Sequence, residues 1–165
     1  KNSKTIKETF YGGSVFVEAT DDSGYAIGID YVPVDLEVGD GSRTDSSTGA
    51  DATAEADTGT RTASAELQDL ITIYVDIPMG SNGYYGTLGF HTVDVTTQET
   101  LNSSSYGDES LHGVLLGFGY KSGNFKYALE YSDFEDIQLE ASGGSATHKI
   151  EADADALKFK IAYGF

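Results

Sequence analysis

The 165-residue sequence predicts an all-β fold whose antiparallel strands run up and down in chain order. Three observations predict it. Apolar and polar side chains alternate along seven segments; glycine is frequent (20 residues) and proline rare (2); and short connections alternate with long polar ones. The length suits one domain rather than two, so we expect residues 1–165 to form a single domain.

The predicted strands each have one largely apolar face, and six of the seven alternate clearly. The fourth is irregular: Leu88 and Phe90 share one face, whereas Val93 and Val95 lie on the other, so we expect a β-bulge near His91. In chain order the strands are residues 10–19, 25–31, 71–77, 84–97, 113–120, 125–131 and 157–165.

The connections differ in length in a regular way. Those at residues 21–24, 80–83 and 121–124 are tight and carry the Gly, Asn, Asp and Ser of hairpin turns. The others, at about 39–60, 99–109 and 141–148, are long and polar. Membrane β-barrels have short turns at one end and long external loops at the other. The acidic loop at about 39–60 has no large apolar residue, so we expect it to be mobile.

Charge and composition exclude several classes of protein. With 10 Lys and Arg against 27 Asp and Glu, the chain carries a formal charge of −17, so we expect no nucleic-acid partner. Cysteine is absent, which excludes disulfides and thiolate metal sites. No apolar run approaches the roughly 20 residues of a membrane helix, whereas membrane β-strands need only about 9–11 residues with one apolar face.

The end of the chain carries a family signature. In Leu157-Lys158-Phe159-Lys160-Ile161-Ala162-Tyr163-Gly164-Phe165, apolar side chains alternate up to a terminal Phe. This ending resembles that of bacterial outer-membrane β-barrel proteins, and the loop pattern is similar to the small eight-stranded OmpA/OmpX-like type. The resemblance implies an outer-membrane location. It also implies that Ile161, Tyr163 and Phe165 form the signal that the barrel-assembly machinery recognises.

The strand count departs from that family. Its barrels have an even number of strands and the last one runs toward the periplasm. Counting back from Phe165, the first predicted strand also runs that way, and residues 1–8 are too short and polar to span before it. We therefore expect an antiparallel up-and-down transmembrane β-barrel of seven visible strands. An eighth, N-terminal strand would be missing or supplied from elsewhere.

Alternation also places charged side chains on the inward face, far from bulk water, where they need partners. We expect an ion-pair cluster centred on Lys158 and Lys160 with Glu130 and Asp30. Such a cluster either lines a conduit for solutes or fills the interior and fixes strand register; the narrow interior of an eight-stranded barrel favours the second. The predicted inward charges are Glu18, Asp30, Asp76, Lys126, Glu130, Lys158 and Lys160.

Five carboxylates continue the outward rows beyond the apolar stretch. They are weak candidates for Ca²⁺ or Mg²⁺ that bridges to lipopolysaccharide, the alternative being a solvated rim. We expect no other cofactor. The five are Asp133, Glu135, Glu151, Asp153 and Asp155.

Catalytic patterns are weak, so we do not expect an enzyme. Two neighbourhoods supply suitable residue types without any indication of geometry: His91 with Thr92 and Asp94, and His112 with Asp108 and Ser110.

Three functions remain open. The first is an outer-membrane barrel with a structural or surface-interaction role, which presents acidic loops to lipopolysaccharide, a phage or another surface protein. The second is a porin-like channel for small solutes. The third is a soluble, lipocalin-like barrel that binds a ligand. The orientation of the apolar rows distinguishes them, because a lipocalin-like barrel holds its apolar side chains inside.

Overall fold

The computed structural model describes residues 9, 11–33, 36–45, 59–99, 108–140 and 149–164. Within these residues the chain forms ten β-strands and no helix. The strands are β1 (Val15–Thr20), β2 (Ala26–Val32), β3 (Leu36–Asp45), β4 (Gly59–Pro78), β5 (Tyr84–Glu99), β6 (Glu109–Ser122), β7 (Phe125–Phe134), β8 (Ile137–Glu140), β9 (Lys149–Ala152) and β10 (Asp155–Tyr163).

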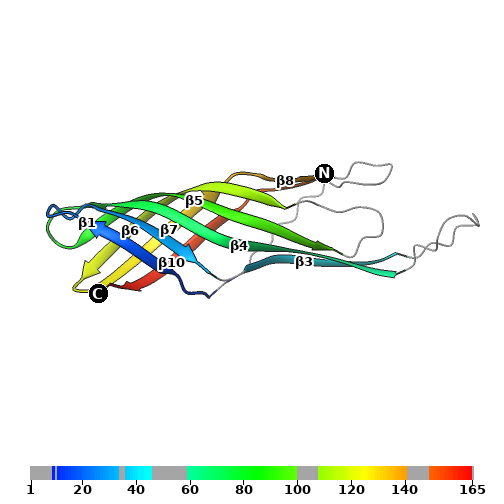
Figure 1. The fold of residues 1–165 in the computed structure, drawn as a ribbon, viewed down its shortest axis with the longest axis horizontal. Helices are drawn as coiled ribbons and strands as arrows, with labels where there is room; N and C mark the ends of the chain where they lie inside the picture. The colour runs from blue at the N-terminus through cyan, green and yellow to red at the C-terminus, as the bar shows by residue number, and fades with distance from the viewer. Residues whose placement is uncertain are drawn as a thin grey trace, which may run out of the picture.

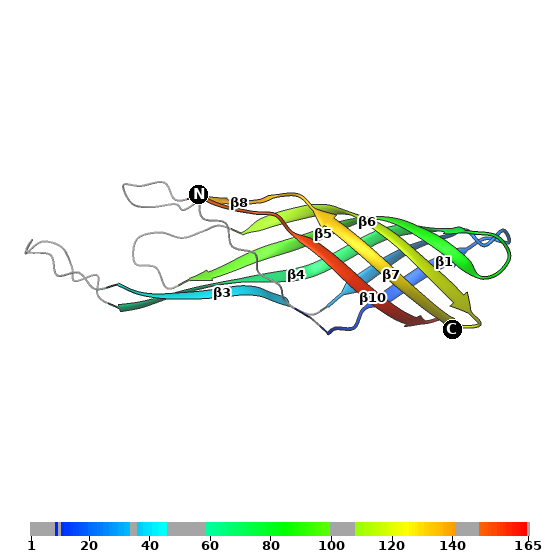
Figure 2. The ribbon, with the colours of Figure 1, turned by 180° about the vertical axis from the view of Figure 1, so that it is seen from behind.

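Seven strands form one antiparallel up-and-down sheet in the order β1-β2-β4-β5-β6-β7-β10, as the alternation predicts. The sheet is elongated and curls on itself (Figures 1 and 2). In the part of the chain that the structure describes, however, β1 and β10 are not paired, so the predicted barrel is not closed. β3 pairs with the first part of β4, and β8 and β9 pair separately with each other.

The tight turns lie where the sequence predicts them, and all are at the end of the sheet where the chain terminates (Figure 1). We call this end, on the left in Figure 1, the lower end, and the opposite end the upper end. Gly24, Gly83 and Gly123 have φ angles of 89°, 85° and 59°, which favour glycine. The predicted loop at about 39–60 is shorter than expected, because β3 reaches Asp45 and β4 begins at Gly59. Residues 46–58, 100–107 and 141–148 lie outside the described residues.

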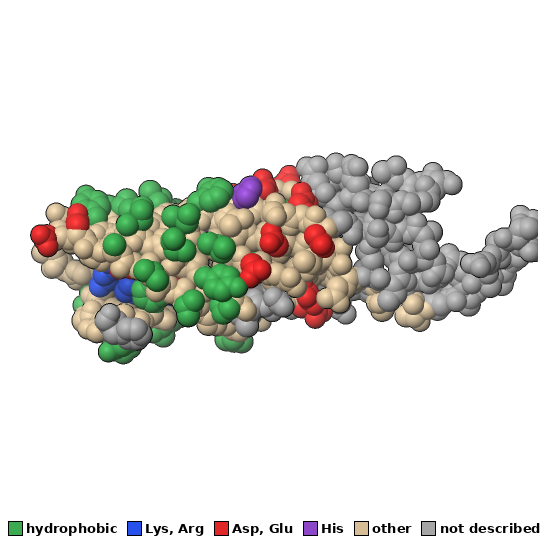
Figure 3. All heavy atoms as spheres, in the orientation of Figure 1, with side chains coloured by type: hydrophobic (Ala, Val, Ile, Leu, Met, Phe, Trp, Pro, Cys, Tyr) green, Lys and Arg blue, Asp and Glu red, His purple; other side chains and the backbone are tan. Residues whose placement is uncertain are grey.

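Apolar side chains face outward and polar ones inward along the lower part of the sheet. On β7, for example, Leu129 and Tyr131 are exposed, whereas Ala128, Glu130 and Ser132 are buried. On the face drawn in Figure 3, apolar side chains spread over the sheet, and most of the acidic ones lie beyond them, away from the tight turns. Among the described residues, no helix is long and apolar enough to cross a membrane.

The β-bulge predicted on β5 does not form there; among the described strands, register irregularities lie on β3, between Glu37 and Gly39, and on β4. β5 alternates regularly, and Val93 and Val95 continue its inward face from His91. The register instead shifts on β4, between Gln68 and Ile71. One extra residue on β4 reverses its alternation there.

Candidate functional site

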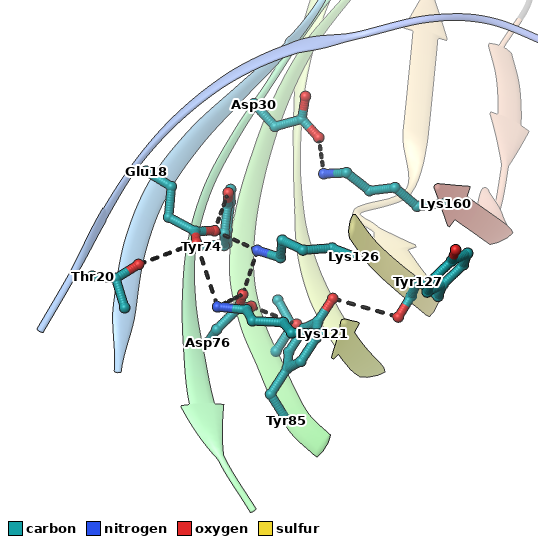
Figure 4. A network of polar contacts seen from close by, with 11 residues as sticks. Glu18, Thr20, Asp30, Tyr74, Asp76, Tyr85, Lys121, Lys126, Tyr127 and Lys160 are labelled. Atoms are coloured by element: carbon teal, nitrogen blue, oxygen red, sulfur yellow. Dashed lines mark hydrogen bonds and ion pairs between the residues drawn. The ribbon is translucent and has the colours of Figure 1, made fainter. Parts of the chain in front are cut away.

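Charged side chains from both halves of the sheet meet on its inner face (Figure 4). Lys126 of β7 forms ion pairs with Glu18 of β1 and, at 2.6 Å, with Asp76 of β4. Lys121 of β6 lies 3.4 Å from the Glu18 carboxylate and 3.5 Å from that of Asp76. The strands joined by these contacts are not neighbours in the sheet, so the contacts cross its interior.

Two further pairs belong to this ion-pair network, which comprises four lysines and four carboxylates among the described residues. Lys160 of β10 pairs with Asp30 of β2, across the interior. Lys158 lies 2.7 Å from Glu130, its direct neighbour on β7. The structure therefore brings together all seven side chains that the sequence places inward, and it adds Lys121. Alternation does not indicate Lys121, because that residue falls in the tight turn predicted at residues 121–124.

Aromatic rings enclose the ammonium groups. Lys126 Nζ lies 5.2 Å from the ring centres of both Tyr74 and Tyr85, and Lys160 Nζ lies 5.4 Å from that of Tyr74 and 5.5 Å from that of Phe16. Such contacts stabilise a cation that has lost water. The Tyr74 hydroxyl also donates to Glu18 at 2.9 Å. No role is predicted for these rings from the sequence, although Tyr74 alternates with the outward Ile73 and Val75.

Glycines make room for the two tyrosines. Gly28 is the cross-strand neighbour of Tyr74, and a Cβ at Gly28 would lie 2.4 Å from the Tyr74 ring. Gly119 has the same relation to Tyr85, at 2.3 Å. The rings lie over these glycines and fill the interior, so that the cavity between Tyr74, Tyr85 and the charged groups measures only about 10 Å³. That volume holds about one water molecule at most.

The interior changes character toward the upper end. His91 is buried and lies 2.7 Å from Thr72 Oγ1 and 2.8 Å from Ser132 Oγ, with its ring stacked on Phe134. Above it the inner face is hydrophobic. We call this cluster the apolar plug: Leu67, Leu70, Val93, Val95, Leu111 and Phe134. The β4 bulge serves the plug, because it turns Leu67 inward opposite Val95.

The outer face changes in the opposite sense at about the level of His91. Below this level lies the belt, which we define as the exposed apolar side chains of the seven strands. On β6 the belt consists of Val114, Leu116, Phe118 and Tyr120. Above it the exposed side chains are largely polar or acidic. They include Asp69, Asp94, Ser110, His112, Asp133 and Asp155.

The candidate metal ligands do not form a site in the described residues. Asp133 and Asp155 face each other across β7 and β10, and Glu135 accepts a hydrogen bond from the His112 amide at 2.8 Å. Asp153 is exposed, and the side chain of Glu151 lies outside the described residues. No group of three or more His, Asp or Glu that could hold a metal ion occurs in the portion described.

The remaining candidates from the sequence are the assembly signal in the last strand and the two neighbourhoods around His91 and His112. Ile161 and Tyr163 face outward on β10, and Phe165 lies outside the described residues. His91 faces inward, away from the exposed Asp94, so that predicted neighbourhood does not form. His112 stacks on Phe90, while Ser110 donates to Asp94 at 2.6 Å.

Comparison with known proteins gives no match: no family model, no curated protein and no solved structure is similar to this chain.

Proposed function

We propose that this chain is a β-barrel protein of the bacterial outer membrane, with a structural or surface-interaction role. The observation that supports the proposal is the reversed burial of its side chains. Twenty-six large apolar side chains in the described part of the chain are exposed, whereas Asp30, Asp76 and Glu130 are at most 5% exposed. In water this arrangement leaves the hydrophobic surface unburied; in a bilayer it is the favoured one.

The belt has dimensions that suit a thin membrane. On β6 it extends from Val114 to Tyr120, six residue steps or about 20 Å along an extended strand. A tilt of about 40° reduces this to roughly 16 Å, and aromatic side chains extend it at the lower end. The bacterial outer membrane is thinner than average, which favours a belt of this height. The same outward orientation argues against a lipocalin-like barrel.

The filled interior favours a structural role over transport. A porin-like channel needs a continuous aqueous path, whereas here the ion-pair network, the tyrosines and the apolar plug occupy the inner face in succession. The acidic side chains above the belt would then form the surface offered to lipopolysaccharide or to another protein. Closure of the sheet by an eighth strand is part of this proposal, since an open sheet edge in lipid leaves backbone groups unpaired.

Tryptophan fluorescence tests the location, because the chain contains no tryptophan. Phe118→Trp places the probe in the belt, and Ser110→Trp places it above the belt on the same strand. In vesicles whose acyl chains carry bromine, we expect strong quenching of the first variant and little of the second. Equal quenching of both, or a folded protein that does not bind vesicles, would contradict the proposal.

The resemblance of the last strand leads to a separate test of assembly. If the barrel-assembly machinery recognises that strand, deletion of Phe165 should greatly reduce insertion into the outer membrane in cells. The same variant should still fold when refolded directly into detergent, because the deletion removes no member of the ion-pair network. Normal insertion in cells would contradict the assigned signal.

A further inference from the structure

A groove crosses the belt on the outer face of the sheet, from the turn before β5 to β10. Its volume is about 410 Å³, within the range of roughly 300–1,000 Å³ that is usual for sites of small molecules. The outward position between Tyr84 and Leu88 on β5 is Gly86, so the belt lacks a side chain there. Besides Gly86 and Gly117, the groove is lined by apolar side chains, those of Met79, Leu116, Phe118, Leu129, Tyr131 and Leu157.

The groove runs through the height of the belt, because rows of cross-strand neighbours are inclined to it. One such row consists of Phe159, Leu129, Phe118 and Gly86. On β10 this row lies one outward position below Leu157, at the upper edge of the belt, whereas on β5 it lies one outward position above Tyr84, at the lower edge. An elongated aliphatic chain lying across a bilayer follows this course, whereas a compact ligand would occupy only part of it.

Two carboxylates lie at the upper end of the groove. Asp133 of β7 and Asp155 of β10 are direct cross-strand neighbours, one outward position above Tyr131 and Leu157. Both are exposed, and the Tyr131 hydroxyl donates a hydrogen bond to Asp155. Like charges directly opposite each other on a sheet are destabilising, and a cation between them removes this cost.

An ammonium group suits this pair better than a divalent metal ion. Its N–H groups are hydrogen-bond donors that the oxygens of two carboxylates can accept. Ca²⁺ takes about six to eight oxygen ligands. No group of three or more His, Asp or Glu that could hold a metal ion occurs where the structure describes the chain. The apolar groove begins directly below the two carboxylates, so one molecule with an ammonium head and an aliphatic chain would fit both features.

We propose that the groove holds one acyl chain of a membrane lipid whose headgroup carries an ammonium group, and that this group is bound between Asp133 and Asp155. The inference rests on the proposed membrane location, since a bilayer presents acyl chain and headgroup at these two levels. It goes beyond the general contact of the belt with lipid, because it assigns one position and one headgroup chemistry. The same two carboxylates repel an anionic headgroup.

Fluorescence quenching by two lipids tests the inference, because the chain contains no tryptophan of its own. The reporter is Phe118→Trp, which lines the groove. The vesicles contain equal parts of phosphatidylethanolamine, whose headgroup has an ammonium group, and phosphatidylglycerol, whose headgroup is anionic. Bromine is placed on the acyl chains of only one of the two lipids at a time. Ile73→Trp, exposed in the belt on β4 and outside the groove, is the matched reporter.

In the Phe118→Trp protein, we expect phosphatidylethanolamine to quench more than phosphatidylglycerol. The preference should exceed that in the Ile73→Trp protein by about threefold, the strength of an exposed ion pair. The second reporter is needed because the chain, with a formal charge of −17, repels anionic lipid as a whole. Equal preference at both positions would mean that only this general repulsion acts, and it would overturn the proposal.

Exposed carboxylates test the headgroup contact in the Phe118→Trp protein. Asp133→Asn combined with Asp155→Asn should abolish the additional preference, and because both positions are exposed the double variant should still fold. Asp94→Asn, which changes an exposed carboxylate on β5 outside the groove, should retain the preference. Retention in the double variant would show that these carboxylates do not bind the headgroup.

Filling the groove tests the position of the acyl chain. A Cβ at Gly86 would lie in ordinary contact, 3.8 Å from Met79 Sδ and 3.9 Å from Gly117 O, so Gly86→Leu has room and should abolish the additional preference. Ala19→Leu, outward on β1, is its control and should retain it. A preference that survives Gly86→Leu contradicts the groove as the site.

Two further outcomes separate the inference from its alternatives. If Mg²⁺ reverses the preference toward phosphatidylglycerol, the carboxylates hold a metal ion that bridges to phosphate, and the assigned ammonium group is wrong. Strong but equal quenching by the two lipids in the Phe118→Trp protein refutes the groove inference alone. Absence of quenching by either lipid refutes the membrane location itself.

Discussion

The lower and upper parts of the sheet follow opposite rules of burial. In the lower part, ion pairs lie inside and the belt lies outside; in the upper part, the apolar plug lies inside and acidic side chains lie outside. The strands β5 and β6 pass through both parts without a break. The backbone pattern is thus the same in both, and the polarity of the side chains reverses where, in our proposal, the surrounding medium changes from lipid to water.

The largest expected effect comes from breaking the ion-pair network. Asp76 is 1% exposed, pairs with Lys126 and accepts a hydrogen bond from Thr87 at 2.8 Å. Asp76→Asn keeps the shape of the side chain but leaves Lys126 short of a counter-charge. We expect the free energy of unfolding, measured by urea titration in detergent, to fall by about 3–5 kcal/mol.

The exposed Asp153, outside the network, provides the control: Asp153→Asn should change the free energy of unfolding by less than about 0.5 kcal/mol. Lys126→Met combined with Asp76→Asn should cost less than the sum of the two single changes, because the two side chains interact. Equal stability of Asp76→Asn and the wild type would mean that water reaches the network.

A second prediction compares the same substitution, to Arg, in the belt and in the polar outer face above the belt. Leu116 and Ser110 both face outward on β6, the first in the belt and the second above it beside Asp94. Leu116→Arg should destabilise the protein in vesicles by about 2–4 kcal/mol, whereas Ser110→Arg should cost about 1 kcal/mol or less. Similar values for both, from unfolding in vesicles, would remove the distinction between the two parts.

The sequence predicts the strands better than it predicts their surroundings. Alternation locates the seven strands of the up-and-down sheet and seven of the eight charged side chains of the network, because the side-chain period of a strand is local. It misses β3 and Lys121. It misinterprets Val93 and Val95, because a change from polar to apolar on one face looks the same as a bulge. It also does not reveal that Lys160 pairs with Asp30 across the interior, which depends on how far the sheet curls.

A third prediction concerns the packing of the lower interior. Gly28→Ala places a methyl group 2.4 Å from the Tyr74 ring. The ammonium groups of Lys126 and Lys160 lie over the face of this ring in cation–π contacts, which limit its movement. We expect a loss of about 1–3 kcal/mol in the free energy of unfolding. Gly13→Ala, where nothing lies within 4 Å, is the matched control. Tyr74→Leu should make the protein less sensitive to Gly28→Ala; the same loss in that background would contradict the packing of ring on glycine.

The smallest effect tests the bulge that turns Leu67 into the apolar plug. Asp69 has a φ of 54°, in the left-handed region, and accepts a hydrogen bond from the Tyr31 hydroxyl at 2.6 Å. Asp69→Ala and Asp69→Gly both remove that acceptor, but only glycine adopts this φ without steric cost. The glycine variant should therefore be the more stable of the two, by about 1 kcal/mol in urea unfolding. If the alanine variant is as stable as the glycine variant, the backbone at Asp69 is not held in this conformation, and the plug does not depend on a bulge there.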